Sequence, residues 1–206
     1  MAVGHREELL AAAKRCLYEQ GYARTTARDL VAASGTNLAS IGYHYGSKDN
    51  LMNQAMISAV GDWSDELNSV LTGVDLTADT PLARFEAIWT LILGTFEVHR
   101  PLWVATFEIY PQIEHVPEVK QVIAEALERG RHGLATLFLG LTEPAPAHLA
   151  RSVGSLYSAL LSGVISQWLV DPAHAPSARE LAEGMQIIAA GMVVANSRPK
   201  SVRRRS

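Results

Sequence analysis

The sequence predicts an all-α protein with a small N-terminal unit of three helices and a larger helical body. Apolar residues recur at helical spacing along almost the whole chain, and no segment shows the alternation typical of a half-buried strand. Two short helices near residue 35 are separated only by a turn that contains glycine. Residues 153–170 carry no charge, which predicts a helix that is covered on most of its sides.

The N-terminal unit is marked by residues that start and stop helices. Thr25 and Thr26 offer hydroxyls that can cap a helix start. Gly35 can adopt the left-handed conformation that a tight turn between two helices needs, and Gly21 and Gly46 follow apolar helical stretches. The predicted helices of this unit cover residues 5–20, 28–33 and 38–45.

The body is predicted as a succession of helices set off by serine, threonine and proline. Ser47, Pro81, Pro117 and Ser177 stand where helices begin, and Pro101 forces a break. These helices are expected at residues 47–71, 80–100, 102–110, 117–139, 148–170 and 177–195. We therefore expect domains at 1–47 and 48–197, joined within a continuous helix, and a basic flexible tail at 198–206.

The second helix of the turn has the chemistry of a surface that contacts DNA. Ile41 is its one large aliphatic residue in the middle and should anchor it to the core. Its other side chains are small, hydrogen-bonding or aromatic, and none is an acid that would repel phosphates. We therefore predict that the double-stranded DNA contacts come from Thr36, Asn37, Leu38, Ala39, Ser40, Gly42, Tyr43 and His44.

The segment resembles the DNA-binding domain of the TetR family of bacterial transcriptional repressors. The resemblance covers roughly residues 5–55 and rests above all on the run from Tyr43 to Asp49, YHYGSKD, with the Ser34-Gly35 turn upstream. It implies that Tyr43, His44 and Lys48 contact DNA and that Thr26 and Arg28 contact phosphates. Gly42 departs from the pattern, because many members carry tyrosine there.

The charge distribution fits contact with DNA at one end only. The whole chain carries a formal charge of −3. Residues 1–48 hold six Lys and Arg against four Asp and Glu, whereas residues 49–197 hold seven against seventeen. The tail adds five basic residues and no acid. The acidic body and mildly basic N-terminal unit suit a protein that meets phosphates with its N-terminal end.

Small residues at helical spacing in the last two helices predict a homodimer. They permit close approach of another helix, and we expect a four-helix bundle completed by a second subunit. The alternatives are packing inside one chain and a membrane span, against which several serines in 153–170 argue. The expected interface consists of Ser155, Ala159, Ser162, Gly163, Ser166, Ala182, Ala189 and Ala190.

Aromatic side chains gather in the middle of the chain. They either fill the core or line an apolar cavity in which a few polar groups orient a ligand. The resemblance implies such a pocket, which would hold a small apolar or amphipathic effector whose binding releases DNA. The candidate residues are Trp63, Trp89, Phe96, His99, Trp103, Phe107, Glu108, Tyr110 and Tyr157.

The sequence offers little for catalysis. Cys16 is the single cysteine, no two of the seven histidines are four residues apart, and no nucleophile elbow or phosphate-binding glycine loop occurs. We expect a cytoplasmic protein with no cofactor, no metal and no membrane association. The alternatives are a helical ligand-binding protein that does not read DNA sequence and a small helical enzyme.

Overall fold

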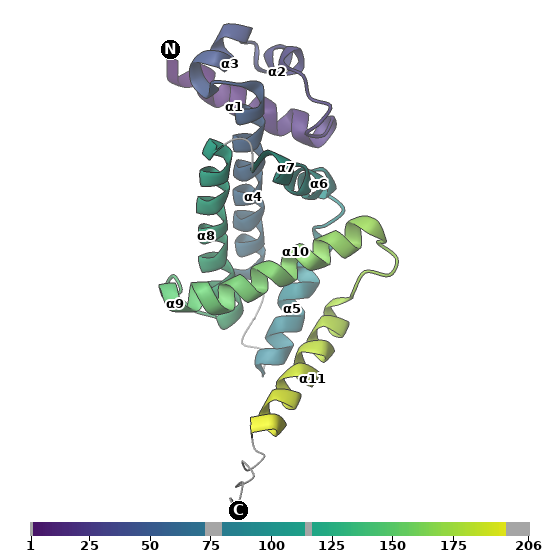
Figure 1. Cartoon of the computed structure of the whole chain (residues 1–206). Helices are drawn as coiled ribbons and strands as arrows, with labels where there is room; N and C mark the ends of the chain where they lie inside the picture. Colours follow the sequence, from purple (N-terminus) through teal and green to yellow (C-terminus); the bar gives the residue numbers. More distant parts are fainter. Residues whose placement is uncertain (1, 73–79, 114–116, 197–206) are drawn as a thin grey trace, which may run out of the picture.

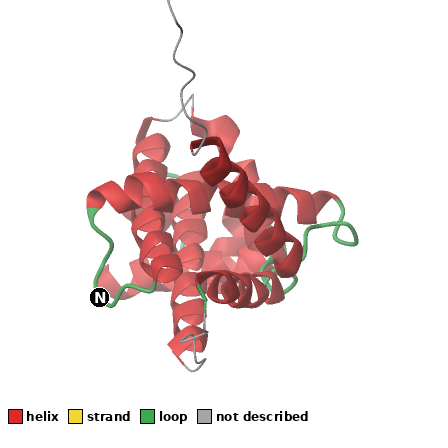
Figure 2. Ribbon diagram, turned by 90° about the horizontal axis from the view of Figure 1, so that it is seen from below, coloured by secondary structure: helices red, strands yellow, loops and turns green. Residues whose placement is uncertain are grey.

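The structure, a computed structural model, describes residues 2–72, 80–113 and 117–196, and all regular elements in those ranges are helical (Figures 1 and 2). The all-α prediction is confirmed. The elements are α1 Ala2–Glu19, α2 Ala27–Ser34, α3 Leu38–Tyr45, α4 Lys48–Thr72, α5 Pro81–Gly94, α6 Arg100–Glu108, α7 Tyr110–Ile113, α8 Pro117–Leu139, α9 Ala147–Leu149, η1 Ala150–Gly154, α10 Ser155–Val170 and α11 Ala178–Asn196.

Helices α1, α2 and α3 gather at the N-terminal end of the molecule and form a unit that we call the head (Figure 1). Its core contains Leu9, Leu17, Leu30 and Ile41, all of them buried. Helix α4 begins against the head and continues without a break into the body, so its first turns share the head's core, as buried Leu51 shows.

The helix ends of the head follow from local chemistry. Gly35 has φ +68°, and its N–H donates to the Val31 carbonyl oxygen, which ends α2 in the left-handed conformation that glycine adopts without strain. Gly46 has φ +76° after α3. The side chain of Ser47 caps α4, because its Oγ accepts the Asn50 N–H at 3.0 Å.

The body packs around aromatic residues. Helices α4 and α8 run side by side, α10 crosses them, and α11 lies mainly along α5 (Figure 1). Trp89 and Phe96 are fully buried, and Phe85 and Phe138 pack with Trp89 at ring-centroid distances of 6.2 and 6.1 Å. These contacts make the centre of the body a solid aromatic core.

Helix α5 is shorter than predicted. The predicted helix ran to residue 100, but α5 ends at Gly94, and residues 95–99 form a turn. Thr95 supplies the physical reason, because its Oγ1 donates back to the Ile92 carbonyl oxygen at 2.7 Å and also accepts the Trp63 Nε1–H at 2.9 Å. A hydroxyl that bonds the local backbone competes with continuation of the helix.

The two prolines after this turn also act differently from the prediction. Pro101 lies in the first turn of α6, where its missing N–H costs no hydrogen bond. The helix predicted at 102–110 ends earlier, since α6 stops at Glu108 and Pro111 lies near the start of a separate helix, α7.

The predicted helix 148–170 contains a π-helical turn, η1, where the chain crosses α8. Gly154 makes this crossing possible, because a Cβ placed on it would lie 2.1 Å from the Arg131 carbonyl oxygen. The backbones of η1 and α8 therefore touch directly, at a distance that no other residue allows.

Residues 147–170 form the one stretch in the described residues that is long and apolar enough, by length and composition, to cross a membrane. Only 17% of its apolar window is buried within the chain, so the expected covering on most sides does not come from this chain itself. The predicted tail, 198–206, lies outside the described residues.

Candidate nucleic-acid interface and ligand cavity

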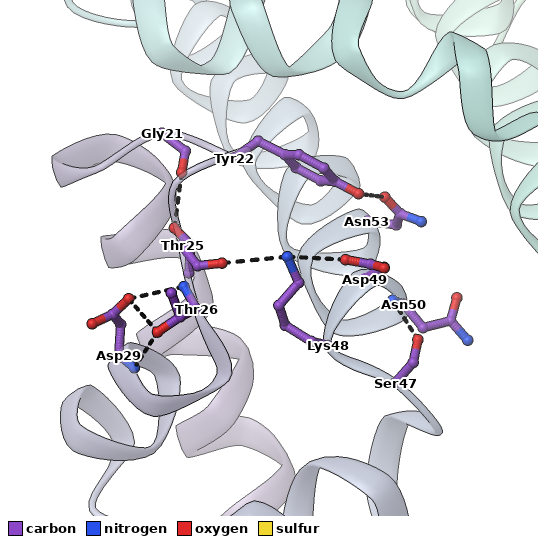
Figure 3. Close-up of polar contacts among 10 residues, drawn as sticks. All are labelled: Gly21, Tyr22, Thr25, Thr26, Asp29, Ser47, Lys48, Asp49, Asn50 and Asn53. Atoms are coloured by element: carbon purple, nitrogen blue, oxygen red, sulfur yellow. Dashed lines mark hydrogen bonds and ion pairs between the residues drawn. The ribbon is translucent and has the colours of Figure 1, made fainter.

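The start of α2 is held by a reciprocal pair of hydrogen bonds. Thr26 caps the helix by accepting the Asp29 N–H through Oγ1 at 3.3 Å. The Asp29 carboxylate accepts in return from the Thr26 N–H at 2.8 Å and from the Thr26 hydroxyl at 2.6 Å (Figure 3). This capping box pairs the backbone N–H groups of Thr26 and Asp29 and so fixes the residue at which α2 begins.

Helix α3 is anchored by two inward residues and turns the others outward. Ile41 and Tyr45 are 4% exposed, and the Tyr45 hydroxyl donates to the Arg6 carbonyl oxygen at 2.7 Å. On the outer side Leu38 is 57% exposed and Tyr43 is 80% exposed. The side of α3 that faces away from the core therefore presents Leu38 and Tyr43 to solvent, where a partner can reach them.

Among the other residues of α3 predicted to contact DNA, some are exposed, whereas others are held by hydrogen bonds within the helix. Ala39 and Gly42 are exposed, and the His44 ring lies edge-on to Tyr43 with centroids 4.8 Å apart. Asn37 caps α3, because its Oδ1 accepts the Ser40 N–H at 3.0 Å and the Ser40 hydroxyl at 3.3 Å.

The residues predicted to contact phosphates are placed around the starts of α2 and α4. The side chain of Arg28 is exposed on α2, whereas the Thr26 hydroxyl is already bonded to Asp29. Thr36 is within hydrogen-bond distance of Ser34, with 2.8 Å between their hydroxyl oxygens. Of these, Arg28 is the side chain most available to a phosphate.

The Lys48 side chain is half-buried at the surface of the head, and its ammonium is held by two contacts. It donates to the Thr25 carbonyl oxygen at 3.3 Å and pairs with the Asp49 carboxylate at 3.0 Å (Figure 3). Its first role is therefore to join the start of α2 to the start of α4. These two contacts use two of the three ammonium donors and leave one for the phosphate contact that the resemblance implies.

Asp29 makes the capping box sensitive to acid. Hydrogen bonds from the Thr26 hydroxyl and then from its backbone N–H lower the pKa of Asp29 below its ordinary value. A lowered folded-state pKa gives stability that is present above the unfolded value of about 4 and is lost as the pH falls through the folded value.

Replacing Thr26 by alanine is expected to lower the midpoint of thermal unfolding by roughly 2–4 °C at neutral pH, the effect of losing one N-cap. The stability of Thr26→Ala should also fall less steeply than wild type below about pH 4. Calorimetry across a pH series checks both effects. Thr90→Ala is the control, because the Thr90 hydroxyl donates to the Glu86 carbonyl oxygen within α5. If the stability of Thr26→Ala falls below about pH 4 as steeply as that of wild type, the capping box does not have this role.

A cavity of about 430 Å³ lies in the body, within the size range of small-ligand sites. Its walls come from α4, α6, the start of α7, α8 and α10. Two of its wall residues are glycines of α8, Gly130 and Gly133, which leave room beside the neighbouring helices. Asp65 and Arg129 supply opposite charges among an otherwise mainly apolar lining.

The structure brings only part of the predicted ligand set to this cavity. Trp63, Trp103, Phe107 and Tyr110 line it, with the Trp63 and Trp103 rings edge-on at 4.9 Å. The other candidates do not line it: Trp89 and Phe96 are in the solid core, Tyr157 stacks on Phe138 at 3.9 Å, His99 contacts α1, and Glu108 lies elsewhere on α6.

Sequence reasoning missed most of the aliphatic wall. Met56 and Val60 of α4, Leu134 of α8 and Leu161 and Ile165 of α10 line the cavity and were not among the candidates. The paired glycines of α8 were the available signal, because two residues without side chains three apart on a helix leave space on one face.

The predicted dimer residues fall into two groups. Ala159, Ser162, Gly163 and Ser166 of α10 and Ala189 and Ala190 of α11 are exposed in the single chain, and Ser155 is half-buried. Ser162 also lines the cavity. Ala182 is 2% exposed and belongs to the core of this chain, so placing it at a subunit interface was wrong. Its small side chain lets α11 pack within the subunit.

Large apolar side chains on the same two helices were not predicted. Leu156 and Val170 of α10 are 59% and 84% exposed, and Ile187, Ile188 and Met192 of α11 are 65%, 55% and 64% exposed. Together with the exposed small residues they form what we call the outer face of α10 and α11. An apolar surface of this kind marks an interaction site.

Comparison with known proteins finds relatives of the head and of the whole fold. The sequence model of "Bacterial regulatory proteins, tetR family" matches residues 9–55. The HTH-type transcriptional repressor AcnR of Corynebacterium glutamicum is 44% identical over 46 residues, which are 22% of this chain and 24% of that protein. The match thus spans about a quarter of the length of the curated relatives.

Solved structures resemble nearly the whole chain. A TetR-family regulator from a Rhodococcus species superposes with a TM-score of 0.63 at 14% identity, covering 90% of this chain and 98% of that one. The multidrug binding protein EbrR, complexed with proflavin, gives a TM-score of 0.61 at 21% identity and covers 89% and 99% of the two chains. At these identities the likeness shows the shared fold of head and helical body.

Proposed function

We propose that the chain is a transcriptional repressor of the TetR family that binds an inverted-repeat operator as a homodimer, since its residues 9–55 match the model of that family. A small apolar or amphipathic effector releases it from DNA. The observation that carries this proposal is the outward face of α3, where Leu38 and Tyr43 are exposed while Ile41 and Tyr45 hold the helix to the head.

The contacts to DNA divide into base reading and phosphate binding. In the proposal Tyr43, His44, Leu38 and Ala39 face the bases of the major groove, and Gly42 lets the backbone of α3 approach closely, since nothing lies within 4 Å of its Cβ position. Arg28 and the polar groups around Thr26, Thr36, Asn37, Ser40 and Lys48 face phosphates.

The proposed dimer forms through the outer face of α10 and α11. One α3 reads only a few base pairs, whereas two heads related by a two-fold axis read two half-sites spaced by about one helical turn or a multiple. Serines and Gln167 on the exposed side of α10 favour a protein partner over lipid, because they can hydrogen-bond across an interface. We therefore propose a cytoplasmic dimer, with the domains divided at residue 47, directly before the helix α4 that joins them.

A charge in the outer face should separate the subunits. Leu156→Glu is expected to weaken the dimer at least about 100-fold, because the carboxylate would have to be buried without a partner. Sedimentation equilibrium measures the change. Val70→Glu is the control, since Val70 is 46% exposed but lies at the end of α4. If Leu156→Glu dimerises as tightly as wild type, the subunit interface does not include Leu156 and the proposed location is wrong.

The proposed effector site is the cavity beside α4. Its aromatic and aliphatic walls, with Asp65 and Arg129 as the charged members of its lining, suit an amphipathic molecule with an apolar body. The neighbour EbrR, described as a multidrug binding protein, was solved in complex with proflavin, which supports the proposal that a protein of this fold binds a small molecule.

Selection of bound sites from random DNA tests the proposal as a whole. We expect an inverted repeat whose half-site spacing matches two heads on one side of the duplex. Binding should weaken steeply with salt, because every phosphate contact occurs twice in a dimer. A protein that selects no sequence even in dilute buffer would leave only a helical ligand-binding protein, and turnover of a bound molecule would indicate an enzyme.

A further inference from the structure

The turn of residues 95–99 between α5 and α6, which we call the α5–α6 connection, contacts three parts of the molecule at once. At its start, Thr95 Oγ1 accepts the Nε1–H of the cavity residue Trp63 at 2.9 Å. At its end, His99 lies one helical turn before Trp103, which also lines the cavity, with their rings 6.4 Å apart. Both ends of the connection are therefore fixed to the cavity wall.

His99 is the residue through which the α5–α6 connection contacts the head. Its ring is 8% exposed, and Nδ1 lies 2.7 Å from the Tyr18 hydroxyl of α1. The two rings meet edge-on at 5.8 Å. On the other side of the ring, Nε2 lies 3.3 Å from the Glu66 carboxylate of α4, within ion-pair distance but without hydrogen-bond geometry. Tyr18 thus makes the directed polar contact with this ring.

Tyr18 belongs to the helix on which the head is built. Helix α1 packs on α2, α3 and α4, and its buried Leu9 and Leu17 lie in the head's core. A displacement of α1 therefore moves the whole head. The nearby ion pair of Lys14 with Asp62, 2.7 Å long, joins α1 to α4 but is exposed and does not involve a cavity residue.

The connection also reaches α10. The Phe96 ring lies 5.4 Å from the Trp168 ring, and the Arg100 guanidinium lies over the same ring at 5.3 Å. Since α10 carries part of the outer face, the connection is in contact with the cavity, the head and the helix proposed to join the subunits.

We propose that the α5–α6 connection reports the state of the cavity to the head through the hydrogen bond between His99 and Tyr18. A ligand that presses on the Trp63–Trp103 pair shifts both ends of the connection, which moves His99 away from Tyr18 and frees α1. This inference rests on the proposed function, because it specifies how the ligand site regulates DNA binding. It adds a contact to α1 that is separate from the continuous path along α4.

The test is a double-mutant cycle that needs neither effector nor operator. Trp103→Phe alters the cavity wall, and Tyr18→Phe removes the hydroxyl while keeping the ring. In the full chain we expect Trp103→Phe to speed amide hydrogen exchange of α1 about two- to tenfold, the effect of one hydrogen bond. In the Tyr18→Phe background the same change should add nothing.

Two further variants make the cycle decisive. Tyr22→Phe is the matched control, because the Tyr22 hydroxyl also joins the head to α4 but does so through Asn53 and not through His99 (Figure 3). In that background the effect of Trp103→Phe should persist. His99→Leu removes the other partner of the same hydrogen bond. In the His99→Leu background, as in Tyr18→Phe, we expect Trp103→Phe to have no further effect on the amide exchange of α1. Additive effects of Trp103→Phe and Tyr18→Phe would overturn the proposal.

Operator binding provides a second readout that separates the two proposals. On the operator recovered by selection, Trp103→Phe should change affinity in wild type and in Tyr22→Phe but not in Tyr18→Phe. If no variant binds DNA, the proposed function fails while the exchange cycle still decides the contact. If the variants bind DNA and Trp103→Phe changes operator affinity equally in all backgrounds, the hydrogen bond between His99 and Tyr18 does not couple the cavity to the head.

Discussion

Replacing Tyr43 by alanine is expected to weaken operator binding about 100-fold and to leave the fold intact. A side chain that contacts a base contributes roughly 1–3 kcal/mol, and a dimer loses two of them. Because Tyr43 is 80% exposed, its loss should change the free energy of unfolding by no more than about 0.5 kcal/mol. Fluorescence anisotropy on the selected operator and urea unfolding measure the two quantities.

The control lies two residues farther along the same helix. Tyr45 is 4% exposed, and Tyr45→Phe removes only its hydrogen bond to the Arg6 carbonyl oxygen. That variant should lose about 1 kcal/mol of stability and keep most of its operator affinity. If Tyr43→Ala binds the operator like wild type, α3 does not read DNA through its exposed face, and the proposed interface is wrong.

The largest expected loss of stability comes from Gly154→Ala. A Cβ at this position would lie 2.1 Å from the carbonyl oxygen and 2.7 Å from the carbonyl carbon of Arg131, and a backbone cannot rotate away as a side chain can. The crossing of η1 and α8 must therefore open, at a cost of about 3 kcal/mol or more. Urea unfolding at fixed protein concentration measures the cost.

Gly133→Ala on α8 is the matched control for that substitution. Nothing lies within 4 Å of its Cβ position, so alanine fits and should stabilise the helix by up to about 1 kcal/mol. The two glycine-to-alanine changes are expected to alter the free energy of unfolding in opposite directions. This difference would show that the cost at Gly154 comes from its contact with the Arg131 backbone. Equal urea midpoints for Gly154→Ala and wild type would show that η1 and α8 can separate at little cost in stability, against the prediction.

The head could be predicted from the sequence because its determinants are local. The predicted bounds of α3, 38–45, agree with the structure since Asn37 caps the helix and Gly46 ends it within the same ten residues. The end of α5 could not be predicted in this way. Its stop at Gly94 depends on Thr95, whose hydroxyl is shared with Trp63, a residue 32 positions away.

The cavity shows the same division between local and distant information. The sequence left two alternatives for Trp89 and Phe96, core or cavity wall, because apolar spacing does not tell whether a buried side chain meets packed core or open space, and both residues lie in the core. That depends on how α8 and α10 cross, and the crossing depends on Gly154 and the π-helical turn. The exposed apolar residues of α11 were hidden for a similar reason, because only the packed fold shows that α5 covers one side of that helix.

The unbroken course of α4 has a mechanical consequence. Its 25 residues, at 1.5 Å each, make a rigid rod of about 37 Å that spans head and cavity. Used as a lever pivoting at its cavity end, such a rod converts a tilt of about 5° into a shift of about 3 Å at the head. Neighbouring base pairs are about 3.4 Å apart along the duplex. If α3 reads DNA as proposed, a tilt this small would shift it by almost one base pair relative to its half-site.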